Sequence, residues 1–125
     1  MTRHVLVIDD ERDIRDVIGL SLEEFGGWQV TSVASGQAGI AQAQAHPWDA
    51  ILLDVSMPDM DGVAVFEILQ TNPKTRTIPV ILLTARVLES DRRRFAALGV
   101  AGVIPKPFDP VVVWQQVAEI LAWPR

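Results

Sequence analysis

Short apolar runs alternate along the chain with segments whose apolar residues recur at helical spacing. Three runs are continuous, at residues 5–8, 50–53 and 79–83, and two less regular ones lie at 28–33 and 102–104. Continuous apolar runs of this length are typical of parallel strands that helices cover on both faces. The pattern therefore predicts five strands.

The segments between these runs have the periodicity of amphipathic helices. In the first segment the apolar residues recur three to four positions apart, at Ile14, Ile18, Leu22 and Phe25. The Gly26-Gly27 pair is expected to end that helix, Asp61 to cap the third helix, and Gly99 to end the fourth. Alternation of strand and helix, repeated five times with short connections, predicts a parallel α/β sheet with helices on both faces.

Composition narrows the classes of function. The chain has 125 residues, no cysteine and a formal net charge of −5, so Cys-zinc sites, disulfides and thiol catalysis are excluded. A pI near 4.8 argues against direct nucleic-acid binding, which requires a basic surface. The longest uncharged stretch, 26–48, is interrupted by polar residues, and the start lacks a signal-peptide layout. We expect one cytoplasmic domain over residues 1–125, with no membrane segment and no output domain.

Polar residues with distinctive chemistry follow four of the five predicted strands. Asp9 and Asp10 follow the first strand, Asp54 follows the third, Thr84 the fourth and Lys106 the fifth. The carboxyl ends of the strands form the binding crevice of an open α/β sheet, so these side chains are expected to converge. Clustered carboxylates repel one another unless a cation neutralises them. An oxygen-only ligand set favours Mg²⁺, with Mn²⁺ also suitable.

Each of these residues alone has an ordinary structural explanation, as a helix cap or a solvated turn. Helix caps and turns do not explain why such residues follow four different strands of the same sheet. This joint placement favours a functional site. A dinucleotide site is excluded, because no G-x-G-x-x-G follows the first strand and two carboxylates stand where a pyrophosphate needs backbone amides.

Four motifs resemble the receiver domain of bacterial two-component response regulators. They are Val-Ile-Asp-Asp-Glu at 7–11, Leu-Leu-Asp-Val-Ser-Met-Pro-Asp-Met-Asp-Gly at 52–62, Leu-Thr-Ala at 83–85 and Lys-Pro-Phe at 106–108. The resemblance covers residues 4–122 and implies a flavodoxin-like (βα)5 fold with strand order 2-1-3-4-5. It also implies a signalling domain, not an enzyme acting on a separate substrate.

The resemblance implies that Asp54 accepts a phosphoryl group from a phosphohistidine, on a sensor histidine kinase or a histidine phosphotransfer protein. Asp10, Asp54 and the backbone carbonyl of Ser56 would coordinate Mg²⁺ directly, with Asp9 holding a metal-bound water. Thr84 and Lys106 would contact the phosphoryl group. The Lys106–Pro107 bond is expected to be cis, as is typical of the family.

The family also implies an output face made of the fourth helix, fifth strand and fifth helix, used for a downstream protein or for self-association. Val103 stands where the family often has Tyr or Phe, so Thr84 and the loop after it are expected to transmit the change. On the fifth helix, spacing predicts an outward row of Val111, Trp114 and Ala118. Ser56 and Arg86 are expected to tune the lifetime of the acyl phosphate.

Two other functions compete with this interpretation. A receiver-like interaction module that signals without phosphate has no physical need for three clustered carboxylates and an ammonium. A metal-dependent phosphohydrolase with an aspartyl nucleophile normally carries a second acid two residues after the nucleophile, where this chain has Ser56. It also needs a cap over the substrate, and the chain has no insertion that could form one.

Overall fold

The computed structural model describes residues 2–85 and 88–124. Five parallel strands form one sheet in the order β2-β1-β3-β4-β5, which confirms the predicted flavodoxin-like topology. In chain order the elements are β1 (His4–Ile8), α1 (Arg12–Leu20), the π-helical turn η1 (Ser21–Phe25), β2 (Gln29–Val33), α2 (Gly36–Ala45), β3 (Ala50–Asp54), α3 (Gly62–Gln70), β4 (Val80–Thr84), α4 (Glu89–Leu98), β5 (Gly102–Pro105) and α5 (Val113–Leu121).

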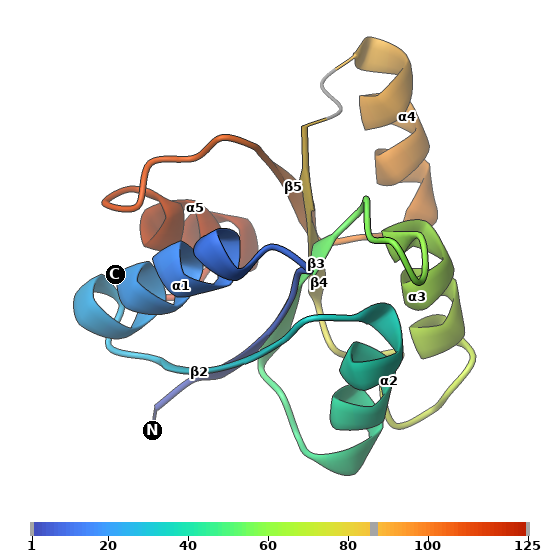
Figure 1. Ribbon diagram of the computed structural model, residues 1–125, viewed down its shortest axis with the longest axis horizontal. Coiled ribbons are helices and arrows are strands. Elements are labelled where there is room, and N and C mark those ends of the chain that lie inside the picture. Colours follow the sequence, from blue (N-terminus) through green and yellow to red (C-terminus); the bar gives the residue numbers. More distant parts are fainter. Residues whose placement is uncertain (1, 86–87, 125) are drawn as a thin grey trace.

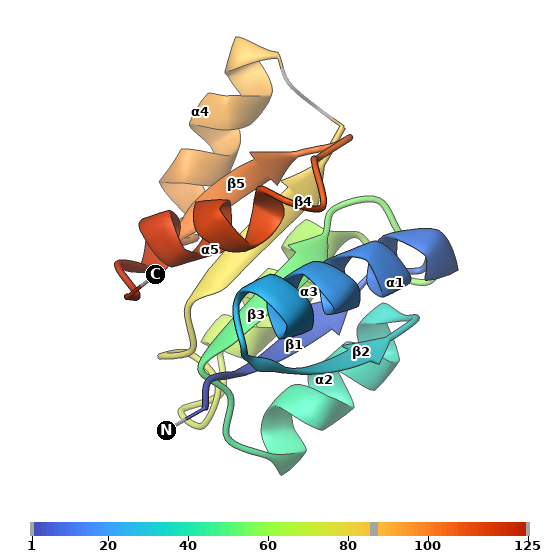
Figure 2. The same cartoon turned by 90° about the vertical axis from the view of Figure 1, so that its left-hand side faces the viewer.

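Helices cover both faces of the sheet, in three layers. Figure 1 shows α1 and α5 on one face and α2, α3 and α4 on the other, and Figure 2 shows the strands running between them. Strands β3 and β4 are buried along their whole length, and β1 is buried except at its first residue, whereas the edge strand β2 is partly exposed. Burial on both faces explains why the three inner strands have continuous apolar runs.

Two hydrophobic cores fill the space between the layers. The core beneath α2, α3 and α4 contains Leu6, Ile51, Leu53, Val65, Phe66, Leu69 and Phe95 among its buried residues. The core beneath α1 and α5 contains Val5, Val7, Ile18, Leu22, Trp28, Leu52 and Val117. Within the described ranges, no helix is long and apolar enough to cross a membrane.

Several predictions of local structure are confirmed. The Asp61 carboxylate caps α3 by accepting a hydrogen bond from the Val63 amide at 2.8 Å. Gly99 ends α4 in the left-handed conformation, with φ of 90°, which glycine adopts without steric cost. The Lys106–Pro107 peptide bond is cis.

Two side chains do not lie on the face that helical spacing indicates. Phe25 is 49% exposed, because the π-helical turn widens the helix after Leu20 and moves Phe25 off the line of Ile18 and Leu22. Ala118 is fully buried, since α5 packs against η1 and its buried face is wider than the spacing indicated. Trp114 is only half-buried and packs against the core beneath α1 and α5.

Candidate functional site

Strand register brings the predicted polar residues to one edge of the sheet. Ile8 pairs with Leu53, so Asp9, the next residue along β1, lies level with the end of β3. In the same way Leu83 on β4 pairs with Asp54, so Thr84, the next residue along β4, lies at the same edge. The Lys106 amide donates to the Thr84 carbonyl at 2.8 Å, which places the lysine at the same edge.

Three carboxylates meet at this edge and form an acidic cluster of Asp9, Asp10 and Asp54. Each contributes an oxygen, and these oxygens all lie within 4.8 Å of one another. Asp9 is fully buried and Asp54 is 3% exposed, while Asp10 is half-buried. Such a concentration of buried acids is electrostatically costly without a compensating charge.

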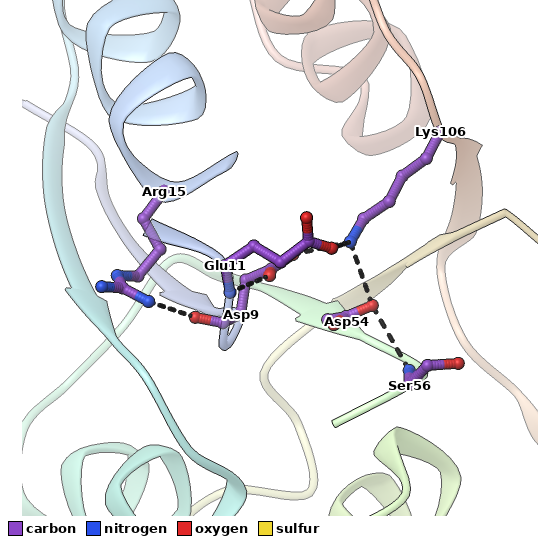
Figure 3. A network of polar contacts seen from close by, with 6 residues as sticks. All are labelled: Asp9, Glu11, Arg15, Asp54, Ser56 and Lys106. Atoms are coloured by element: carbon purple, nitrogen blue, oxygen red, sulfur yellow. Dashed lines mark hydrogen bonds and ion pairs between the residues drawn. The ribbon is translucent and has the colours of Figure 1, made fainter. Parts of the chain in front are cut away.

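The first residue of the cluster is held by the start of α1. The Asp9 Oδ1 atom accepts a hydrogen bond from the Glu11 amide at 2.9 Å, and the Asp9 carbonyl accepts one from Arg15 at 2.8 Å (Figure 3). Glu11 occupies the N-cap position of α1, and no side-chain cap bond is made there. The Asp9-Asp10 pair is therefore not explained as an ordinary helix cap.

Lys106 supplies the compensating positive charge. Its Nζ atom lies 2.9 Å from Asp9 Oδ2, 3.2 Å from Asp54 Oδ1 and 3.5 Å from Glu11 Oε1 (Figure 3). Burial lowers the pKa of Lys106, but the neighbouring Asp9 and Asp54 carboxylates outweigh it and leave the pKa above its usual value. The lysine therefore stays protonated and bridges two acids of the cluster.

The Asp54 carboxylate is unusually basic for an aspartate. Burial, and then the charge of Asp9, raise its pKa to about 6, although Lys106 and the Ser56 amide oppose that shift. Its Oδ1 atom accepts hydrogen bonds from Lys106 at 3.2 Å and from the Ser56 amide at 3.3 Å. One oxygen of the Asp54 carboxylate is thus held in place by two donors.

Two buried oxygens of the cluster lack hydrogen-bond partners within the part of the chain that the structure describes: Asp10 Oδ1 and Asp54 Oδ2. A third, Asp9 Oδ2, meets Lys106 as an ion pair only. Buried polar atoms of folded proteins are normally satisfied. A cluster of carboxylates that retains unsatisfied oxygens fits a hard divalent cation such as Mg²⁺, which prefers oxygen ligands.

The backbone of β3 lies tight against the start of α3. A Cβ on Gly62 would collide with the Asp54 carbonyl oxygen, and the Gly62 amide donates to the Val55 carbonyl at 2.8 Å. Only glycine allows this approach, so α3 begins directly behind the Asp54 peptide group.

The remaining predicted site residues fall in different places. Thr84 is buried at the end of β4, whereas the Ser56 side chain is exposed. Arg86 lies outside the described residues. The sequence predicted no role for Glu11 or Arg15, although Glu11 lies 3.5 Å from Lys106 and Arg15 donates to the Asp9 carbonyl. The signal for Glu11 was its place at the end of the motif at 7–11, and the signal for Arg15 was its position in the first turn of the helix that follows.

Comparisons with known proteins identify the family of the chain. The family model for the response regulator receiver domain matches residues 5–118. The chain belongs to that family. It is 34% identical over 104 residues to a probable chemotaxis protein CheY of Rhizobium etli, covering 83% of this chain and 81% of the relative. It is 38% identical to the phosphate regulon regulator PhoB of Klebsiella pneumoniae over 88% of this chain.

The chain spans about half the length of PhoB, 48% of that protein. Among solved structures, chemotaxis protein CheY4 of Vibrio cholerae superposes with a TM-score of 0.89 at 27% identity, covering 96% of this chain and 99% of that one. The receiver domain of a sensor histidine kinase of Pseudomonas aeruginosa superposes with a TM-score of 0.85 at 27% identity, covering 98% and 99%. That structure holds a magnesium ion in its active-site cleft.

Proposed function

We propose that this receiver domain accepts a phosphoryl group on Asp54 in a Mg²⁺-dependent reaction and transmits the change through its α4–β5–α5 face. The observation that carries the proposal is the Asp54 carboxylate itself. It is buried among Asp9, Asp10 and Lys106, with Oδ1 held by two donors and Oδ2 without a hydrogen-bond partner among the described residues. This arrangement suits an acceptor better than a structural aspartate.

The donor would be a phosphohistidine of a sensor histidine kinase or a histidine phosphotransfer protein. An Asp54 carboxylate oxygen attacks the phosphorus, a new O–P bond forms, and the P–N bond breaks with its electron pair returning to the imidazole. The product is an acyl phosphate. Because the pKa of Asp54 is about 6, the carboxylate is mostly ionised at neutral pH and available for attack.

Mg²⁺ would be held by Asp10, Asp54 and the Ser56 carbonyl, with Asp9 holding a metal-bound water. When bound, the ion neutralises negative charge as the nucleophile and the phosphoryl group approach each other. The unsatisfied oxygens of the acidic cluster support this assignment, as does the magnesium in the Pseudomonas aeruginosa receiver.

Lys106 and Thr84 would stabilise the transferred group. The Lys106 ammonium already lies 3.2 Å from Asp54 Oδ1, so it can form an ion pair with a phosphoryl oxygen by a small displacement. Thr84 is buried at the end of β4, joined to Lys106 by a backbone hydrogen bond. Its hydroxyl is proposed to donate to another phosphoryl oxygen.

Signalling would then pass from Thr84 to α4 and β5. A groove of about 490 Å³ runs between these elements, lined by Arg92, Ala96, Val103 and Pro105 among others. Val103 contributes to its wall where the family often has an aromatic ring, and Trp114 on α5 belongs to the same proposed face. A downstream protein or a second copy of the chain would bind there. Ser56 and Arg86 are proposed to set the lifetime of the acyl phosphate.

Labelling with acetyl phosphate tests the proposal. We expect the purified chain to gain one phosphoryl group by intact mass spectrometry when Mg²⁺ is present, and none after chelation with EDTA. Asp54→Ala should abolish the gain, whereas Asp13→Ala, which removes an exposed acid on α1, should leave it unchanged. Equal labelling of Asp54→Ala and the wild type would reject Asp54 as the acceptor.

A further inference from the structure

The loop between β3 and α3 carries Ser56 close to the acceptor. Its two ends are fixed by backbone hydrogen bonds, from the Val55 amide to Leu83 at 3.1 Å and from the Gly62 amide to Val55 at 2.8 Å. Between these ends, Ser56 and Asp59 are exposed. The position of the Ser56 carbonyl therefore depends on how the middle of this loop is held.

Asp59 ties the middle of the loop to a different element. Its Oδ1 atom accepts a hydrogen bond from the Gly36 amide at 3.1 Å, and its Oδ2 atom accepts one from the Gln37 amide at 3.2 Å. The Ser56 amide also donates to Asp54 at the end of β3; among the described residues, the two Asp59 bonds are the hydrogen bonds that join positions 56–60 to an element other than β3. Met57 and Met60 add apolar contacts with the core beneath α2, α3 and α4.

The two amides are those of the first turn of α2, which have no partner inside the helix. A carboxylate is favoured there because the N-terminal end of a helix carries partial positive charge. The fit is close: a Cβ on Gly36 would lie 2.9 Å from Val65 Cγ2 and 3.0 Å from Met60 Cβ. The start of α2 therefore rests directly on the loop and on α3.

Capping of α2 alone does not require Asp59. Ser35 already occupies the N-cap position, and its hydroxyl accepts a hydrogen bond from the Ala38 amide at 3.1 Å. The Asp59 carboxylate is distinguished from that cap by its origin in the acceptor loop, three residues after Ser56 and five after Asp54. It connects the proposed metal-binding loop to α2, the neighbour of α3 on the same face of the sheet.

We propose that Asp59 is a positioning residue, which anchors the β3–α3 loop on α2 and so holds the Ser56 carbonyl where Mg²⁺ is bound. This inference rests on the proposed function. Without the anchor, the loop keeps its fixed ends and its methionine contacts but gains freedom in the middle. Mg²⁺ must then order the loop when it binds, which weakens its affinity.

The test measures Mg²⁺ affinity by calorimetry, and urea unfolding, for the wild type, Asp59→Ala, Asp59→Asn and Ser35→Ala. Asp59→Ala should weaken Mg²⁺ binding about tenfold, at the lower end of the range for outer-shell partners, and Asp59→Asn less, since one oxygen acceptor remains. Labelling by acetyl phosphate should slow at limiting Mg²⁺ and recover when Mg²⁺ is in excess. Ser35→Ala, the matched loss of a cap on the same helix, should lower stability and leave Mg²⁺ affinity unchanged.

Three results would overturn the inference in distinguishable ways. Wild-type affinity in both Asp59 variants would reject the anchor while the proposed function stands. Equal weakening by Ser35→Ala would attribute the effect to the stability of α2. A wild-type chain that neither binds Mg²⁺ nor becomes labelled would reject the proposed function itself.

Discussion

Helices α3 and α4 cover the same face of the sheet, but they are attached to it very differently (Figure 1). Five residues of α3 are buried, namely Gly62, Val63, Val65, Phe66 and Leu69, whereas in α4 only Phe95 is buried. The start of α3 is capped by Asp61. The N-cap position of α4 is Leu88, which makes no side-chain cap bond and is 69% exposed.

This difference matches the positions of the two helices relative to the site. Helix α3 begins behind the Asp54 peptide group and supports the end of β3. Helix α4 follows Thr84 along the chain, at the point where the proposed signal leaves the site. Elements with few buried contacts open at low free energy, so α4 is the element suited to respond to the proposed phosphorylation, while α3 serves as a fixed support.

The largest effect is expected from removing one buried phenylalanine from each helix, which tests the contrast between α3 and α4. Phe66→Ala should lower the free energy of unfolding by about 3–5 kcal/mol, as expected for a cavity in a well-packed core. Phe95→Ala should lower the free energy of unfolding by less, although Phe95 is as well buried. Helix α4 can detach from the sheet locally, so the loss cannot exceed the free energy that holds α4 in place. Urea unfolding measures both, and equal losses would contradict the contrast.

The second test concerns the contrast between the apolar interior of β3 and its charged carboxyl end. The pKa of Asp54, about 6, lies above its ordinary value of 3.8, so ionisation of this group destabilises the metal-free fold. Asp54→Asn should therefore raise the free energy of unfolding at neutral pH by about 1–3 kcal/mol. Urea unfolding in EDTA checks this, and a variant less stable than the wild type would contradict it.

The sign of the pH dependence follows from the same pKa. An acid with a higher pKa in the folded state binds its proton more tightly there, so its contribution to stability increases as pH falls from above 6 towards 4. The stabilising effect of Asp54→Asn should accordingly shrink over that range. Adding Mg²⁺ at neutral pH should stabilise the wild type more than the variant, because a ligand that binds only the folded state raises its stability.

A smaller effect is expected from giving α4 the cap it lacks. Leu88→Ser should stabilise α4 by about 0.5–1 kcal/mol, because a serine oxygen can accept a hydrogen bond from a first-turn amide. Leu88→Ala, which removes the same exposed side chain without adding an acceptor, is the matched control. Hydrogen exchange should slow in α4 and remain unchanged in α3; an equal change in both helices would argue that they open together.

The fold and the centre of the site could be predicted from the sequence because both depend on local patterns. Continuous apolar runs identify strands covered on both faces; the Asp9-Asp10 pair and Asp54 directly follow such runs, and Lys106 comes two residues after the less regular run at 102–104. A parallel sheet then brings them together whatever the details of packing. The same argument placed Thr84 at the end of β4, where it is buried.

Contacts that depend on packing were not predictable in this way. The bond between Arg15 and the Asp9 carbonyl and the tie between Asp59 and α2 join segments whose relative position only the folded chain defines. Helical spacing indicates the centre of a buried face but not its width, which is why Ala118 was wrongly expected to point outward. The π-helical turn, which exposes Phe25, has no sequence signal that we recognised.

Direct localisation of the phosphoryl group tests the central claim that Asp54 is a Mg²⁺-dependent acceptor. Borohydride reduces an acyl phosphate on aspartate to homoserine, which peptide mass spectrometry can assign to a position. After treatment with acetyl phosphate and Mg²⁺ we expect homoserine at position 54, and none in the sample with EDTA. Homoserine at position 9 or 10 in place of 54, or an equal yield without Mg²⁺, would contradict the account.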